Sequence, residues 1–175
     1  DIFATQYTAE SDSFGPDYDK GAPWTGTLDI DWYLDDPDAT EYTISSAEEL
    51  AGLAAIVNGT AKSEISKLAT DAAETVIHDN FKGKTIKLGA DLNLNGLDWT
   101  PIGDNPSPFL GNFDGQGYTV SNLFVVNDGW AGLIGHAGLS VGSTIKNLTI
   151  ENVTVTGIGY VDGTLYGTVE EAYAS

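Results

Sequence analysis

The chain has 175 residues, of which 26 are acidic and 7 basic, and its formal net charge at pH 7 is −19. This excess of negative charge excludes nucleic acid as a partner, because neutralising phosphates requires many Lys and Arg residues, and every basic residue here is Lys. No apolar run approaches the roughly 20 residues needed to cross a membrane, and the absence of Cys excludes disulfides, zinc–thiolate sites and Cys nucleophiles. Met is also absent, even at position 1, so we expect the numbering to begin inside a longer precursor.

Residues 1–43 are predicted to form an acidic lead-in or cap that belongs to the same domain as the rest of the chain. Asp29 and Asp31 alternate with apolar neighbours, which indicates a strand with both carboxylates on one face. Calcium binds oxygen ligands and would stabilise so acidic a segment, although a solvated acidic face explains the same residues. The candidate metal ligands are Asp29, Asp31, Asp35, Asp36 and Asp38.

Residues 44–80 carry the helical signal. Ser46 and Glu49 form a capping box, the apolar stripe then runs from Leu50 to Val57, and Asn58-Gly59 is typical of a helix end. A second stripe predicts another helix from Ser63 to about Ile77. Both helices are interpreted as an insertion or cap.

From Phe81 to residue 175 the pattern becomes strand-like, with a half-buried strand, or two strands around Gly89, between Lys84 and Leu94. Thr119–Val125 (TVSNLFV) recurs 25 residues later as Thr144–Ile150 (TIKNLTI). Asn122 and Asn147 interrupt the alternation, so we expect them at sharp corners, hydrogen-bonded to each other on neighbouring strands. A repeat of this length predicts an all-β fold, a right-handed parallel β-helix (solenoid) with one or two flanking helices, with a β-sandwich as the alternative.

The segments Phe81–Gly103, Phe109–Val125 and Trp130–Gly135 closely resemble bacterial surface proteins that carry the GLUG motif. Trp24–Thr60 resembles the segment that often precedes this motif in large secreted proteins. The resemblance implies a repetitive β-helical region of a cell-surface or secreted bacterial protein, with other domains in the same parent chain, and implies no catalytic residue. At Tyr160–Gly167 the sequence departs from the motif, so we expect an irregular last turn, a cap, or continuation beyond residue 160.

The first hypothesis is a non-catalytic module of a bacterial surface adhesin that contacts a host or glycan surface, or serves as a stiff spacer. The alternatives are an accessory carbohydrate-binding module of a secreted glycosidase or peptidase, and a small polysaccharide-acting enzyme. Trp24, Trp32 and Tyr33 are the candidate ligand-binding residues, because sugar rings stack on exposed aromatic rings; packing within the fold is the competing interpretation. We predict no catalytic residue and no required cofactor, with calcium as an optional ligand.

Overall fold

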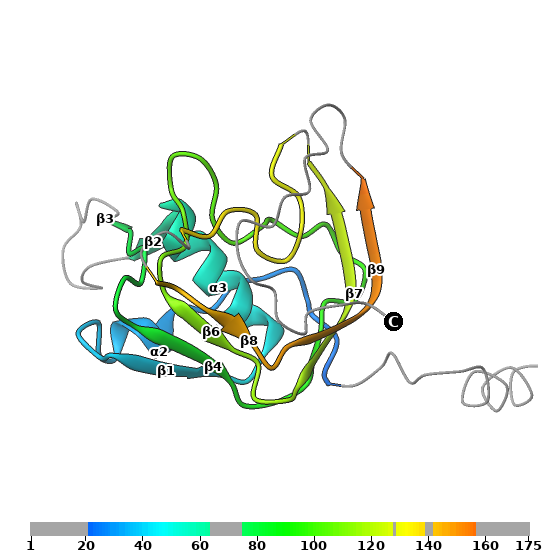
Figure 1. Ribbon diagram of the computed structural model, residues 1–175, viewed down its shortest axis with the longest axis horizontal. Coiled ribbons are helices and arrows are strands. Elements are labelled where there is room, and N and C mark those ends of the chain that lie inside the picture. Colours follow the sequence, from blue (N-terminus) through cyan, green and yellow to red (C-terminus); the bar gives the residue numbers. More distant parts are fainter. Residues whose placement is uncertain (1–20, 64–74, 128, 139–141, 157–175) are drawn as a thin grey trace, which may run out of the picture.

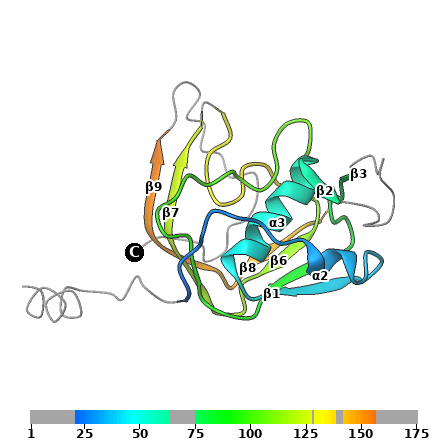
Figure 2. The same ribbon diagram turned by 180° about the vertical axis from the view of Figure 1, so that it is seen from behind.

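The structure is a computed structural model that describes residues 21–63, 75–127, 129–138 and 142–156. Figures 1 and 2 show it from opposite sides. In chain order the elements of these residues are α2 (Asp31–Leu34), β1 (Glu41–Ile44), α3 (Ala47–Asn58), β2 (Ala61–Ser63), β3 (Thr75–Ile77), β4 (Thr85–Leu88), β5 (Leu92–Asn93), β6 (Asn112–Asp114), β7 (Thr119–Val126), β8 (Ile145–Lys146) and β9 (Thr149–Thr156).

Helix α3 begins and ends where its local sequence predicts. The Ser46 hydroxyl accepts the N–H of Glu49 at 3.1 Å, and the Glu49 carboxylate accepts the N–H of Ser46 at 3.3 Å, which completes the predicted capping box. Gly59 ends the helix with a φ of 70°. Eight of the twelve residues of α3 are buried, so the helix is a central part of the hydrophobic core.

A four-stranded parallel sheet, in the order β1-β4-β6-β8, lies against α3. Figures 1 and 2 agree that the helix crosses one face of this sheet. One residue of each strand stands in the same register row, and all four residues are buried: Tyr42, Ile86, Phe113 and Ile145. This apolar row fixes the register, because a slip of one residue would turn it away from the core.

A second parallel sheet has the order β5-β7-β9, and strands β2 and β3 form a separate antiparallel pair. In Figure 1, β7 and β9 stand side by side at the end of the molecule away from β2 and β3. One hydrophobic core joins residues from Trp24 to Leu148, so the acidic lead-in, α3 and the later strands share one interior.

The predicted fold class, an all-β right-handed parallel β-helix, is wrong. The strands form two separate parallel sheets and one antiparallel pair, with no closed or solenoid sheet among the described residues, and α3 packs inside the core where a flanking cap was expected. Alternating residues predict strands correctly, but they do not specify which strands pair or what covers their faces.

The second predicted helix, Ser63 to Ile77, is also wrong at its end, because Thr75–Ile77 is strand β3, paired with β2. Residues 64–74 of that prediction lie outside the described residues, as does the expected cap or irregular turn after residue 160. The prediction of two strands around Gly89 is confirmed by β4 and β5.

The expected pairing of Asn122 with Asn147 is wrong as well. Thr119 pairs with Thr149, a separation of 30 residues, so Asn122 meets Asn152, whereas Asn147 meets Asp114 in the other sheet. The expected left-handed conformation is confirmed, since Asn122 and Asn147 have φ values of 58° and 53°. Asn147 forms the corner between β8 and β9, whereas Asn122 lies within β7, as Asn152, with a φ of 51°, lies within β9.

Candidate functional site

Two turns of nearly identical geometry follow strands β5 and β6. In the first, Asn95 and Gly96 have φ values of 59° and 65°, and in the second Gln116 and Gly117 have values of 54° and 81°. The N–H of Leu97 donates to the carbonyl of Leu94, and that of Tyr118 to the carbonyl of Gly115. Two consecutive residues with positive φ define a type I′ turn, a conformation that Gly adopts without strain and that Asn tolerates better than most other residues.

Asp114 stabilises the second turn and ties it to the next strand. Its Oδ1 accepts the N–H of Gln116 and the Nδ2–H of Asn147, both at 3.0 Å, and Lys146 Nζ lies 3.6 Å from Oδ2. Burial alone would raise the pKa of the Asp114 carboxyl, but these hydrogen bonds and the lysine lower it below its ordinary value. Asp114 therefore stays ionised and acts as a structural acceptor.

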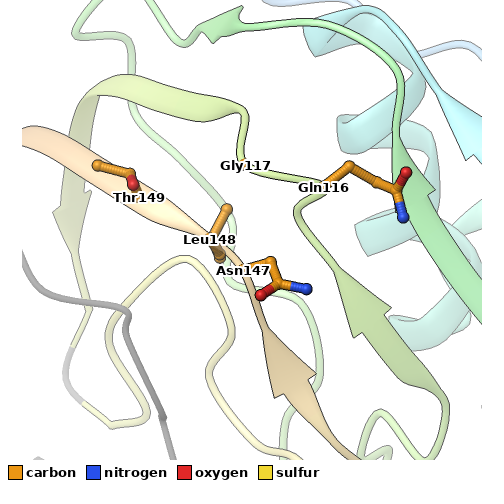
Figure 3. Close-up of a pocket in the computed structure, with 5 residues that line it drawn as sticks. All are labelled: Gln116, Gly117, Asn147, Leu148 and Thr149. Carbon is orange, nitrogen blue, oxygen red and sulfur yellow. The ribbon is translucent and has the colours of Figure 1, made fainter.

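Beside this turn lies an open hollow of about 460 Å³, lined by Gln116, Gly117, Asn147, Leu148 and Thr149. Figure 3 shows Gln116 and Gly117 on the turn before β7, opposite Asn147, Leu148 and Thr149 on the segment that enters β9. Gln116 and Asn147 are exposed, Thr149 is half-buried and Leu148 is buried. The side chains offer neutral amide and hydroxyl groups, which both donate and accept hydrogen bonds.

The aromatic residues predicted to bind ligand pack inside the protein. Trp24 is 7% exposed and meets Trp99 edge-on at 5.5 Å, while Tyr33 is 9% exposed. Trp32 is half-buried and contacts Tyr42 and Phe81 at centroid distances of 5.1 and 6.1 Å. The rings of Trp24 and Tyr33 thus offer no open face to a sugar, which agrees with the packing interpretation.

The predicted metal ligands are not brought together. Asp29 and Asp31 do not share a strand face, because residues 31–34 form the short helix α2, and Asp29 Oδ1 accepts the N–H of Asp31 at 2.8 Å. Asp35, Asp36 and Asp38 are exposed on the segment that follows. Within the described residues, no group of three or more Asp, Glu, His or Cys side chains is placed to hold a metal ion.

A polar cluster that the sequence did not reveal joins Tyr33, Asp79 and Lys84. Asp79 Oδ2 accepts the Tyr33 hydroxyl at 2.9 Å and forms an ion pair with Lys84 Nζ at 2.7 Å. Lys84 also donates to the carbonyl of Pro37 and lies 5.3 Å from the centre of the Tyr33 ring. Tyr33 lies 46 residues before Asp79, so no local spacing brings all three residues together.

The titration of this cluster argues for a structural role. Burial, followed by the hydrogen bond to Asp79, raises the pKa of Tyr33 well above its ordinary value. Burial alone would raise the pKa of Asp79, but bonds from Lys84, Phe81 and Tyr33 lower it; the pKa of Lys84 is raised because Asp79 outweighs burial. The phenol and ammonium groups therefore keep their protons at neutral pH, and the carboxylate stays ionised.

No family model matches the chain, and no solved structure matches it. Over 72 residues the chain is 43% identical to Halomucin of Haloquadratum walsbyi (strain DSM 16790 / HBSQ001). The matched segment covers 38% of this chain and 1% of Halomucin. Over 96 residues the chain is 33% identical to a putative Gly-rich membrane protein of Evansella cellulosilytica. The matched segment covers 49% of this chain and 10% of that protein.

The matched segments span a tenth or less of the curated relatives, so similar segments occur within much longer proteins, one of them named as a membrane protein. Among the described residues of this chain, no helix is both long and apolar enough to span a bilayer.

Proposed function

We propose that this chain is a non-catalytic contact module of a larger extracellular surface protein of the adhesin kind, and that it contacts neutral carbohydrate. Its similarity to segments of Halomucin and of a putative membrane protein supports a surface location. The resemblance to GLUG-motif proteins points the same way. The alternative is an accessory carbohydrate-binding role beside another domain of the same parent chain.

The observation that carries this proposal is the hollow beside the Asp114 turn. Its polar lining residues, Gln116, Asn147 and Thr149, carry amide and hydroxyl groups, all uncharged. Sugar hydroxyls both donate and accept hydrogen bonds, so neutral amide and hydroxyl groups complement them. The net charge of −19 disfavours anionic polymers by long-range repulsion, which leaves neutral glycans as the favoured ligand class.

The hollow also has a fixed shape. Asn147 is anchored through Nδ2 to Asp114, and Gly117 donates its N–H to the carbonyl of Asn147 at 2.9 Å. Both walls are therefore positioned before a ligand arrives. A preorganised site loses less conformational entropy on binding than a mobile one, which favours affinity for a weakly interacting ligand such as a sugar.

A glycan array probed with and without calcium tests the proposal. We expect binding to one or more neutral glycans, weakened by Gln116→Asn, which tolerates the positive φ but retracts the amide, and by Thr149→Val, which removes the hydroxyl. Thr40→Ala, an exposed threonine outside the hollow, is the matched control and should leave binding unchanged.

Three outcomes would redirect the proposal. Loss of binding on Trp24 or Trp32 substitution, in protein that keeps its fold, would favour the aromatic platform over the hollow. Absence of binding to every glycan on the array would favour a spacer that binds nothing. Depolymerisation of a polysaccharide by the purified chain would favour an enzyme.

A further inference from the structure

Among the residues that the structure describes, strand β9 has one partner strand and one open edge. Its residues Thr149 to Thr156 pair in parallel with β7, and among the described residues no strand pairs with its other side. In Figure 1, β9 is the outermost arrow of its sheet. The unpaired backbone groups of such an edge are a template for a further strand.

The apolar row that faces the core in β7 continues in β9 but loses its cover there. Leu123 pairs with Val153, and their exposed fractions are 3% and 36%; Val125 pairs with Val155, with fractions of 0% and 46%. Paired residues of neighbouring strands point to the same face of a sheet. Two aliphatic side chains on the core-facing row of β9 are thus partly exposed to solvent.

A ladder of side-chain amides crosses the same sheet and ends at β9. Asn122 Nδ2 donates to Asn93 Oδ1 at 2.9 Å, and Asn152 Nδ2 donates to Asn122 Oδ1 at 2.6 Å. The Asn of each strand donates a hydrogen bond to the Asn of the preceding strand in the sheet. An Asn on an added strand would therefore donate to Asn152 Oδ1, which has no hydrogen-bond partner among the described residues. Such a ladder continues only through a parallel strand with Asn at the aligned position.

Glu151 adds a second acceptor beside the ladder. It pairs with Ser121, which pairs in turn with Asn93, and its Oε2 is buried without a hydrogen-bond partner. A buried acceptor without a partner costs free energy that an incoming donor would recover. Apart from Glu151, residues 149–156 carry no charge, so a neutral strand meets little repulsion from this acidic protein.

We infer that the open edge of β9 binds an extended strand of another protein, added in parallel. Its pattern is Ser or Thr, then Asn, an aliphatic residue, any residue, and a second aliphatic residue. This addition would place a hydroxyl on Glu151, an amide on Asn152, and two aliphatic side chains over Val153 and Val155. Main-chain hydrogen bonds supply affinity in strand addition, and the alternate side chains supply specificity.

A second copy of this chain fits less well. Two β9 strands in parallel register would set Glu151 against Glu151, and an antiparallel pair would break the amide ladder. The inference goes beyond the proposed carbohydrate contact, and it does not depend on it.

The probe is a fluorescent peptide with the sequence of Thr119–Val126, TVSNLFVV, extended by neutral Gly-Ser residues for solubility, added to the whole chain. We expect saturable binding by fluorescence anisotropy and new hydrogen-exchange protection confined to β9. A control peptide with Leu in place of the Asn should bind roughly fivefold more weakly, because it loses the hydrogen bond to the side-chain amide of Asn152.

Two variants of the protein locate the site. Val155→Lys places a charge in the apolar row, and Asn152→Gly keeps the positive φ but removes the amide; both should weaken peptide binding. Val76→Lys, at a valine of β3 with 54% exposure, is the matched control and should bind normally, and neither edge variant should alter glycan binding.

The inference is overturned if the peptide does not bind, if the control peptide binds equally well, or if Val155→Lys has no effect. It is also overturned if sedimentation shows a dimer that Val155→Lys dissociates and that excludes the peptide, because a second copy would then be the occupant.

Discussion

Phe81 has a φ of 60°, although it is aromatic and fully buried. This conformation costs on the order of 1–2 kcal/mol for a residue with a side chain. Asp79 offsets the cost, because its Oδ1 accepts the Phe81 N–H at 2.7 Å while Oδ2 binds Tyr33 and Lys84. The ring of Phe81 then lies 5.6 Å from that of Tyr33 and 5.9 Å from that of Tyr42.

Replacing Asp79 by Asn should therefore destabilise the fold by roughly 1–3 kcal/mol, because the half-buried Lys84 ammonium loses its anionic partner. Urea unfolding with an unchanged m-value measures the loss. Glu41→Gln is the control: it removes an ion pair with Lys87 at 2.7 Å that is much more exposed, and should cost about 0–1 kcal/mol. Equal losses in the two variants would contradict a special role for Asp79.

The same carboxylate predicts a pH dependence. Because the pKa of Asp79 is lowered by folding, its contribution is fully present above the ordinary Asp value, about 3.9, and is lost as the pH falls through the lower folded value. The difference in free energy of unfolding between the wild type and Asp79→Asn should shrink below about pH 4. A difference that stayed constant down to strongly acidic pH would contradict this assignment.

At the scale of an element, helix α3 packs so closely against the backbone of Asp29 that Gly52 leaves no room for a side chain. A Cβ on Gly52 would collide with the backbone carbonyl of Asp29. Gly→Ala within a helix normally stabilises by about 1 kcal/mol. Here we expect net destabilisation, because overpacking costs typically 1–3 kcal/mol. Ala51→Gly calibrates the propensity effect in the neighbouring position, and a rise in the thermal midpoint of Gly52→Ala would contradict the close contact.

The amide ladder is the corresponding feature of the β5-β7-β9 sheet. Asn122→Gly keeps the positive φ and removes both ladder bonds, so it should cost roughly 1–3 kcal/mol. Asn122→Ala should cost about 1 kcal/mol more, because Ala disfavours this conformation. Urea unfolding of both variants, with the exposed Asn105→Ala as a neutral control, separates hydrogen bonding from backbone strain. Equal stability of the Gly and Ala variants would contradict the strain component.

The features of these elements that were predictable from sequence are the local ones. Ser46 and Glu49 lie three residues apart and form their capping box within one turn of helix. The left-handed conformation of Asn122 and Asn147 was likewise predictable, because tolerance of this conformation is a property of the residue itself. The partner of each asparagine was not, since the length of the connecting segments decides which strands pair, and a sequence repeat of 25 residues differs from a pairing separation of 30.

The candidate site was less predictable than the asparagine conformations. Whether Trp24 is a platform or a core residue depends on Trp99, which lies 75 positions further along the chain. Gln116 and Thr149 come together only because β6 pairs with β8 and β7 with β9. The type I′ sequence around Gly117 could have indicated a turn, but nothing in it identified the opposite wall of the hollow.

On the scale of the whole molecule, the net charge of −19 opposes the compact state. Salt screens this repulsion, so molar NaCl should raise the thermal midpoint relative to low ionic strength. We expect CaCl2 and MgCl2 to give the same increase at matched ionic strength. A rise specific to calcium, lost when Asp29 and Asp31 are both changed to Asn, would instead support a calcium site in the acidic segment.

Parallel pairing also has a consequence for how the protein is made. Glu41 pairs with Thr85, 44 residues further along the chain, and Phe113 pairs with Ile145, 32 residues further along. Because the paired residues are distant in sequence, we expect folding to be slow. At typical synthesis rates, roughly 5–20 s separate the emergence of Ile44 from that of Ile145. During the first part of that interval, before β4 and β6 emerge, the apolar faces of β1 and α3 lack these strands as cover. The nascent chain should therefore depend on chaperones until its last strands emerge from the ribosome.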